Sequence, residues 1–104
     1  MTNQSSERDQ RHYKRMLEAI PRSWDMASLA SLIATLDFLL ESVEACDSDW
    51  KNRFRKQWGV LEEVNALVLD EGRTTFTVDE QQLLNHAVKE LKALIEEAQQ
   101  AVDN

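Results

Sequence analysis

Histidine and cysteine, the residues best suited to bind metals, are few in this chain and are not spaced as a metal site. The sequence has two histidines and one cysteine. Helical di-iron centres use Glu-x-x-His pairs aimed into a bundle, and the sequence contains no such pair. His86 and Glu90 are four residues apart, but the apolar pattern around them places both on the outer face of a helix. His12 is also expected to be solvated, so we predict no metal and no other cofactor.

Nucleophilic and acid–base chemistry have no better support. Cys46 falls on an apolar stripe, where a lone cysteine behaves as a small hydrophobe. An activated thiolate needs a histidine or a cation beside it, whereas Cys46 is followed by Asp47 and Asp49, whose charges raise the pKa of a thiol. Paired carboxylates such as Glu62-Glu63 are adjacent in sequence and so point about 100° apart on a helix. We therefore predict that the chain is not an enzyme.

The segment 51–56, Lys-Asn-Arg-Phe-Arg-Lys, is the best candidate for nucleic-acid binding. Trp50 and Trp58 lie on either side of it. Binding of a single strand needs exposed rings and basic residues on the same open surface. Helical spacing instead puts Trp50, Phe54 and Trp58 on the core side and spreads the basic residues over the other directions. We predict that the chain binds no nucleic acid, which its acidic balance also indicates.

The elements that carry these residues are predicted to be helices. Two glycines and one proline are too few for the reversals of a sheet. A first helix, with few apolar residues, is expected at about 7–20. Ser23 is expected to cap a second helix and Ser48 a third. Thr77 and Glu80 form a capping box at the start of a fourth helix.

Apolar residues in the second, third and fourth helices recur mostly at spacings of three and four, the pattern of a bundle seam. The first helix carries Tyr13, Met16, Leu17 and Ile20 on one stripe. The second helix carries Leu29, Leu32, Leu36, Leu39, Val43 and Cys46. The third helix, about 49–70, carries Trp50, Phe54, Trp58, Leu61, Val64 and Val68. The fourth helix carries Leu84, Val88, Leu91, Ile95, Ala98 and Val102.

Short connections make the helices antiparallel. The link between the second and third helices is only a residue or two long, which forces an antiparallel hairpin. Gly72 is placed to end the third helix in the left-handed conformation, and the loop 73–76 leads to the fourth helix. We predict an all-α antiparallel helical bundle of three long helices plus an N-terminal helix. It forms a single domain over residues 1–104, with 1–6 as a disordered tail.

Charge and hydropathy restrict the environment of the protein. The formal net charge is −7, from 12 basic and 19 acidic residues. A lone cysteine fits a reducing compartment, the N-terminus lacks the apolar stretch of a signal peptide, and the longest uncharged stretch, 26–36, is shorter than the ~20 residues of a membrane span. We expect a cytoplasmic protein with no membrane contact. The basic residues of 51–58 are expected to pair with the acidic end of the second helix, Glu41, Glu44 and Asp47.

The back of the second helix is the surface that the sequence pattern singles out. Opposite its leucine seam lie Ala27, Ser31, Ala34, Phe38 and Ala45. A helix that is apolar on all sides is normally buried on all sides, so either the first helix or a second chain is expected to cover this face. We interpret the chain as a non-enzymatic interaction module, an adaptor or regulator that binds a protein partner or its own copy as a homodimer, with no small-molecule ligand evident. The alternatives are an acidic inhibitor, such as an antitoxin or immunity protein, and a small helical enzyme with a site between subunits.

Overall fold

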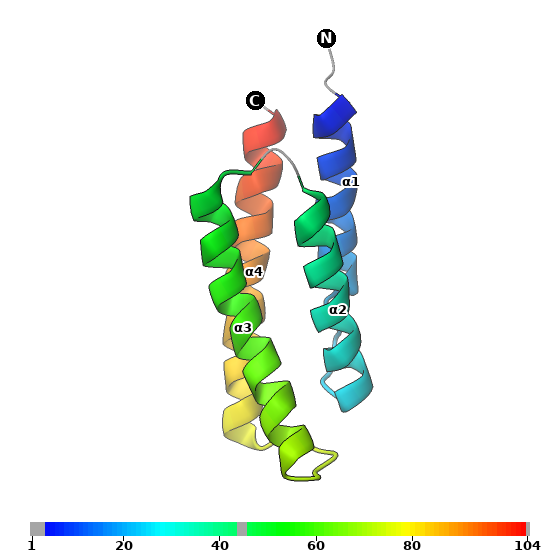
Figure 1. Ribbon diagram of the computed structural model, residues 1–104, viewed down its shortest axis with the longest axis vertical. Coiled ribbons are helices and arrows are strands. Elements are labelled where there is room, and N and C mark those ends of the chain that lie inside the picture. The colour runs from blue at the N-terminus through cyan, green and yellow to red at the C-terminus, as the bar shows by residue number, and fades with distance from the viewer. Residues whose placement is uncertain (1–3, 44–45, 104) are drawn as a thin grey trace.

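Four α-helices make up the described part of the chain. The computed structural model describes residues 4–43 and 46–103, with side chains from 7 to 43 and from 46 to 100. The helices are α1 Gln4–Ala19, α2 Met26–Ser42, α3 Ser48–Asp70 and α4 Val78–Asp103 (Figure 1). No strand occurs in these ranges. The all-α fold predicted from the sequence is confirmed.

The first helix begins earlier than predicted. Residues 4–6, expected to belong to a disordered tail, have a helical backbone, and residues 1–3 lie outside the described residues. The added turn contains neither glycine nor proline, and Glu7 lies in the first turn, where a carboxylate is favoured by the helix dipole. The helix ends at Ala19, just before Ile20 and Pro21, because a residue before proline is disfavoured in the helical conformation.

The helices form an up-down-up-down bundle. α1 packs against α2 and α4, and α3 packs against α2 and α4 (Figure 1). The N-terminal helix is therefore a full member of the bundle, which is elongated, at 52 × 21 × 20 Å. Among the described helices, none combines the length and the apolar content needed to cross a membrane.

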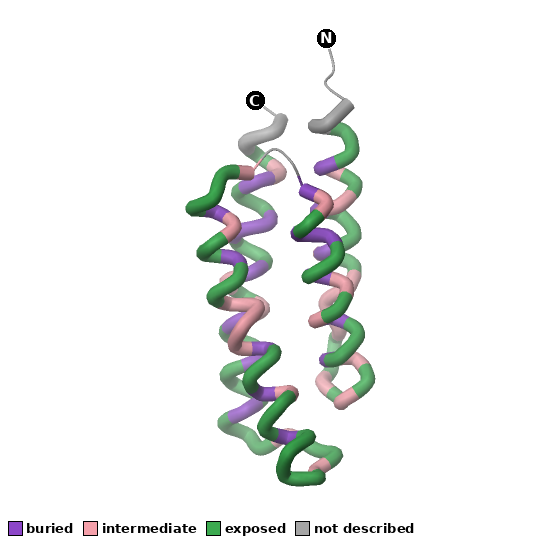
Figure 2. Tube along the Cα trace, viewed as in Figure 1, coloured by how far each residue is buried: buried purple, intermediate pink, exposed green. Residues whose placement is uncertain are grey.

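The core is built from one apolar stripe of each helix, coloured purple in Figure 2. α1 contributes Tyr13 and Met16. α2 and the residue after it contribute Leu29, Leu32, Leu36, Leu39, Leu40 and Val43. α3 contributes Trp50, Phe54, Leu61, Val64 and Val68, and α4 contributes Leu84, Ala87, Leu91, Leu94, Ile95 and Ala98. The predicted seam positions that are only partly buried are Leu17, Ile20, Cys46, Trp58 and Val88, while Val102 lies outside the described side chains.

Aromatic side chains connect the helices near the middle and one end of the core. The rings of Trp50 and Phe54 lie 5.2 Å apart, and Tyr13 meets Trp50 edge-on at 6.2 Å. The indole N–H groups of the two α3 tryptophans donate to backbone oxygens of neighbouring helices. Trp50 Nε1 donates to Leu94 O at 2.9 Å. Trp58 Nε1 donates to the carbonyl of Ile33, also at 2.9 Å. These bonds fix the position of α3 along both of its neighbours.

The N-caps of α2 and α3 are aspartates, not the predicted serines. The Asp25 carboxylate accepts from Ser28 N at 2.7 Å, and Ser28 Oγ accepts from Asp25 N at 3.0 Å, so the two form a capping box. Asp47 accepts from Trp50 N at 2.9 Å. Ser23 lies two residues before Asp25, and Ser48 is already the first residue of α3. A carboxylate three residues before an orphan N–H caps it and also favours the positive end of the helix dipole.

The turn between α3 and α4 is closed by hydrogen bonds on both sides. Gly72, at φ +67°, ends α3 in a Schellman motif in which Arg73 N donates to Val68 O and Gly72 N donates to Leu69 O. The predicted capping box is confirmed, since Glu80 N donates to Thr77 Oγ1 at 3.1 Å and Thr77 N donates to Glu80 Oε1 at 2.8 Å.

Arg73 adds an ion pair that sequence reasoning missed. Its two terminal nitrogens donate to the two Glu80 oxygens at 2.8 Å each, and its Nε donates to Glu71 at 3.0 Å. The guanidinium, followed by the backbone N–H of Thr77, lowers the pKa of Glu80 to about 2. Planar two-point pairing of this kind is geometrically specific, so the turn is held in one conformation.

The buried position of Phe54 predicts a large cost for its truncation. Phe54→Ala is expected to lower the free energy of unfolding by about 3–5 kcal/mol, because it empties a fully buried aromatic site. Urea denaturation followed by circular dichroism measures this change. Leu67→Ala, at a side chain that is 49% exposed, is the matched control and is expected to stay within about 0.5 kcal/mol of wild type. Equal urea midpoints for Phe54→Ala and wild type would contradict the assignment of Phe54 to the buried core.

The Arg73–Glu80 pair predicts a pH-dependent contribution to stability. Glu80 has a lower pKa in the folded chain, about 2, than its ordinary 4.5. The charged form therefore stabilises the fold fully above about pH 4.5, and this contribution is lost as the pH falls towards about 2. In Glu80→Gln the amide oxygen can still accept from Thr77 N, but the amide NH2 group cannot accept from Arg73, so the charge and the two-point pairing with Arg73 are removed together. Urea titrations at several pH values should show the gap between wild type and variant closing in acid, and a constant gap from about pH 6 to about pH 2.5 would refute this.

Candidate functional site

The back of α2, predicted to be an interaction surface, is exposed in the folded chain. Ala27, Ser31, Ala34 and Phe38 are all exposed, and Phe38 is 66% exposed. We call these four residues the α2 outer face. Ala45, the fifth residue of the predicted surface, lies outside the described residues.

α1 does not cover the α2 outer face. It packs beside it, on the side of α2 that carries Thr35 and Leu39. The sequence analysis expected either the first helix or a second chain to cover this face. The first helix does not, because its apolar residues Tyr13 and Met16 are buried in the core that it shares with α2 and α4.

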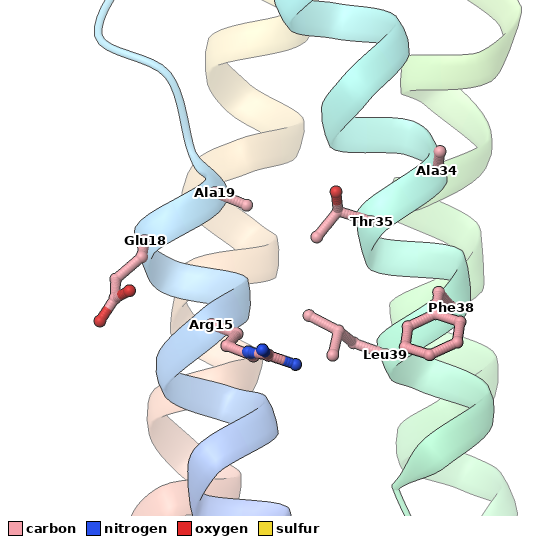
Figure 3. A pocket seen from close by; sticks show the side chains of 7 residues that line it. All are labelled: Arg15, Glu18, Ala19, Ala34, Thr35, Phe38 and Leu39. Carbon is pink, nitrogen blue, oxygen red and sulfur yellow. The ribbon is translucent and has the colours of Figure 1, made fainter.

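A groove separates α1 from the α2 outer face. It has a volume of about 510 Å³ and is lined by Arg15, Glu18, Ala19, Ala34, Thr35, Phe38 and Leu39. Arg15 reaches from α1 towards α2, whereas Glu18 points away from the groove (Figure 3). The small side chains of Ala19 and Ala34 leave the space open, and Phe38 stands at its edge. The patch thus combines a protruding ring with a recess.

Charge is distributed unevenly around this patch. Arg15 lies on the α1 side, and Asp37 and Glu41 lie on the α3 side of α2, since they are placed about 100° and 60° from Phe38 on the helix. Glu41 pairs with Arg55 of α3 at 2.9 Å. Arg15 and Asp37 make no ion pair with any described residue. On the α1 edge Arg15 points towards α2 while Glu18 points away from the groove (Figure 3), and on the opposite edge both charged residues are acidic.

Titratable side chains also meet on the core side of α1, where Tyr13 Oη and Cys46 Sγ share a hydrogen bond of 2.9 Å. Burial, the hydrogen bond to Cys46 and the charge of fully buried Asp9 raise the pKa of Tyr13 above its ordinary value. Burial also raises the pKa of the Cys46 thiol, with the charges of Asp9 and Asp47 acting in the same direction. Both groups stay protonated at neutral pH, so the pair provides no activated nucleophile.

His12 corrects a prediction. It was expected to be solvated, but both of its ring nitrogens are buried and lack a hydrogen-bond partner. Residues 12, 15 and 19 lie on one stripe of α1, and Arg15 and Ala19 of that stripe face α2 across the groove. The imidazole is thus shielded by helix packing that the sequence of α1 does not reveal.

No metal centre is visible in the described part of the chain, where no three histidine, cysteine or acidic side chains are grouped to hold an ion. His86 is exposed as predicted, and its Nε2 lies 4.0 Å from Glu90. A second, smaller hollow between α3 and α4, of about 240 Å³, is lined by Arg53, Lys56, Gln57, Glu90 and Leu94.

The basic segment at the start of α3 is occupied by internal contacts. Arg55 pairs with Glu41 across the α2–α3 hairpin, as predicted, while Glu44 lies outside the described residues. Arg53 pairs with Asp49 at 3.2 Å and with Glu97 of α4 at 3.5 Å, and Lys51 Nζ donates to Val43 O. Trp50 and Phe54 are in the core and have no face open for a base to stack on.

Comparison with known proteins gives no relative, because no family model, no curated protein and no solved structure matches the chain.

The environment of Cys46 predicts slow thiol chemistry. Alkylation by iodoacetamide is expected to show a higher pH midpoint in the folded chain than in the same chain unfolded in urea, because burial and nearby carboxylates raise the thiol pKa. Asp47→Asn should lower the folded-state midpoint, since it removes one of these charges while keeping a side chain that can cap α3. Identical midpoints in folded and unfolded chains would rule out this environment.

Proposed function

We propose that the chain is a non-enzymatic protein-interaction module that self-associates through the α2 outer face. The observation that supports this most is the exposure of Phe38 on a helix whose first eleven residues carry no charge. A solvated helix face normally carries charged residues, and an exposed apolar patch on a small domain usually marks a contact surface. The proposal includes a cytoplasmic location, consistent with the lone, half-buried Cys46.

The shape of the patch favours a second copy of the chain as the partner. A two-fold dimer uses the same patch on both subunits, so the patch must be complementary to itself. Phe38 protrudes at the edge of the groove lined by Ala19, Ala34 and Leu39. In a symmetric pair, each Phe38 ring can enter the groove of the other subunit. The alanines and serine of the α2 outer face let the two helices approach closely.

The charged edges of the patch favour one of the two symmetric arrangements. If both α2 helices point the same way, a two-fold axis parallel to them sets the Arg15 edge of each subunit against the Asp37 and Glu41 edge of the other. If the helices run antiparallel, like edges meet. Opposite charges at the rim of an interface chiefly set specificity and orientation. We therefore propose the parallel arrangement of the two α2 helices.

Sedimentation equilibrium tests the self-association. The wild type is expected to be dimeric at high micromolar concentration and Phe38→Asp monomeric, because a charge replaces the ring at the centre of the patch. Both should keep the same far-UV circular dichroism, since Phe38 makes no part of the buried core. Leu69→Asp, at a side chain that is 61% exposed on a different part of the surface, is the matched control and should remain dimeric.

Charge reversals at the two edges of the patch test the proposed orientation in the same sedimentation experiment. Arg15→Glu alone should weaken the dimer, and Arg15→Glu combined with Asp37→Arg should restore it in the parallel arrangement. A wild type that stays monomeric at high micromolar concentration would reject the self-association. Failure of the double variant to recover would reject only the parallel orientation.

A further inference from the structure

The groove between α1 and α2 is large enough for a small molecule. Its volume of about 510 Å³ lies within the range of roughly 300–1,000 Å³ that is typical of small-molecule sites. Such sites are mostly apolar, with a few polar groups that orient the ligand. The side chains of Ala19, Thr35 and Leu39 point into the space between the two helices (Figure 3). Because the groove is shared by two helices, the sequence alone gives no sign of a small-molecule ligand.

Arg15 is the charged side chain of this groove that is placed to bind an anion. It reaches from α1 towards Leu39 (Figure 3), and it makes no ion pair with any described residue. Glu18, the other charged residue of the lining, points away from the groove. A guanidinium presents two N–H donors in one plane, which match the two oxygens of a carboxylate.

Neighbouring arginines on α1 strengthen the attraction for an anion. Arg8, Arg11 and Arg15 follow one another at spacings of three and four, so they lie on one stripe of the helix. The acidic edge of α2 lies beyond Phe38, on the α3 side. The formal net charge of −7 repels anions at long range, but this repulsion is screened beyond about 8 Å at physiological salt. The charge that an anion meets inside the groove is therefore mainly that of Arg15.

The two ends of the groove differ, and this difference orients a ligand. Ala19 is the last residue of α1, and the C-terminal end of a helix carries a partial negative charge. Arg15 lies one turn earlier in the same helix. A carboxylate is thus favoured at Arg15, and an apolar body is favoured beside Ala19 and Thr35.

We infer that the groove binds a small amphipathic monocarboxylate, with the carboxylate on Arg15 and the apolar body over Leu39 towards Ala19. The bound molecule fills the space that the Phe38 ring of a second copy is proposed to enter, so the ligand and the dimer compete. The competition rests on the proposed self-association, whereas the binding itself does not. The ligand would thus regulate the protein-interaction module through the groove that its partner uses.

Octanoate is the probe for this site. It is added to the ¹⁵N-labelled full-length chain, and chemical shifts are followed by nuclear magnetic resonance. Saturable shifts centred on Ala19, Thr35 and Phe38 are expected, with a Kd between about 0.1 and 1 mM. Hexanoate should bind more weakly by up to about fifteenfold, because each CH₂ group removed costs up to about fourfold in affinity.

Charge variants test the role of Arg15. Arg15→Gln should weaken octanoate binding about fivefold and should leave the affinity for 1-octanol unchanged, because only the carboxylate uses the guanidinium. Comparing the two ligands on the same variant cancels any change in self-association. Lys14→Gln removes a charge from an exposed position about 100° from Arg15 around α1. It is the matched control and should bind octanoate like the wild type.

Size variants test the position of the apolar body. Ala19→Leu fills the groove and should weaken the binding of both octanoate and 1-octanol. Ala30→Leu makes the same change at an exposed alanine about 140° from Thr35 around α2, and it should weaken neither. Far-UV circular dichroism checks that both variants keep the helical fold.

Four results would overturn the inference. They are no saturable shifts up to about 5 mM octanoate, shifts centred on another surface, equal affinity for octylammonium, and octanoate binding that Arg15→Gln does not change. Sedimentation equilibrium at saturating octanoate tests the competition, and the dimer is expected to dissociate. A dimer that persists would overturn the competition. A wild type that is monomeric without octanoate would reject the proposed dimer and leave the binding results unaffected.

Discussion

The packing of α3 against α4 provides the frame on which α1 and α2 are placed. These are the two longest helices, and their seams supply more than half of the core, including the buried Phe54 and Leu91. The indole of Trp50 bonds to the carbonyl of Leu94 in the same interface, and that bond fixes the position of one helix along the other. α1 and α2 are shorter and cover one side of this pair. Because α3 and α4 are longer than α1 and α2, one end of the α3–α4 hairpin is not covered by the other two helices. Burial of the core residues does not cover this end.

Polar contacts at the helix ends determine where the bundle turns. Asp25, Asp47 and Thr77 each satisfy a backbone N–H that would lack a partner inside its helix. Caps of this kind contribute about 1 kcal/mol each, less than a single buried aromatic, yet they decide which residue begins each helix. The turn after α3 has the most hydrogen bonds of these turns, because Arg73 bonds to residues on both sides of it. Rigid turns are what allow exposed apolar side chains to be held in fixed positions.

Two surfaces remain apolar after the core is complete, and they differ in physical character. The α2 outer face is made of small residues around one ring and borders a groove, so a helix can approach it closely. The exposed apolar side chains near the turn between α3 and α4 are Leu67, Leu69, Val78 and Leu83. The α2 outer face with its groove has both a protrusion and a recess, and the proposed two-fold pairing needs both.

We could predict from the sequence alone the four helices, their seams, the glycine that ends α3 and the Thr77–Glu80 capping box, because these features depend on spacings within a few residues. It also indicated the uncharged back of α2. The packing of the folded chain shows three further features, which are that α1 lies beside that face, that His12 is shielded, and that Tyr13 reaches Cys46. The reason is physical: such contacts depend on how far one helix is shifted along another. Side chains distant in sequence set that shift, and it cannot be predicted from the apolar periodicity of a single helix.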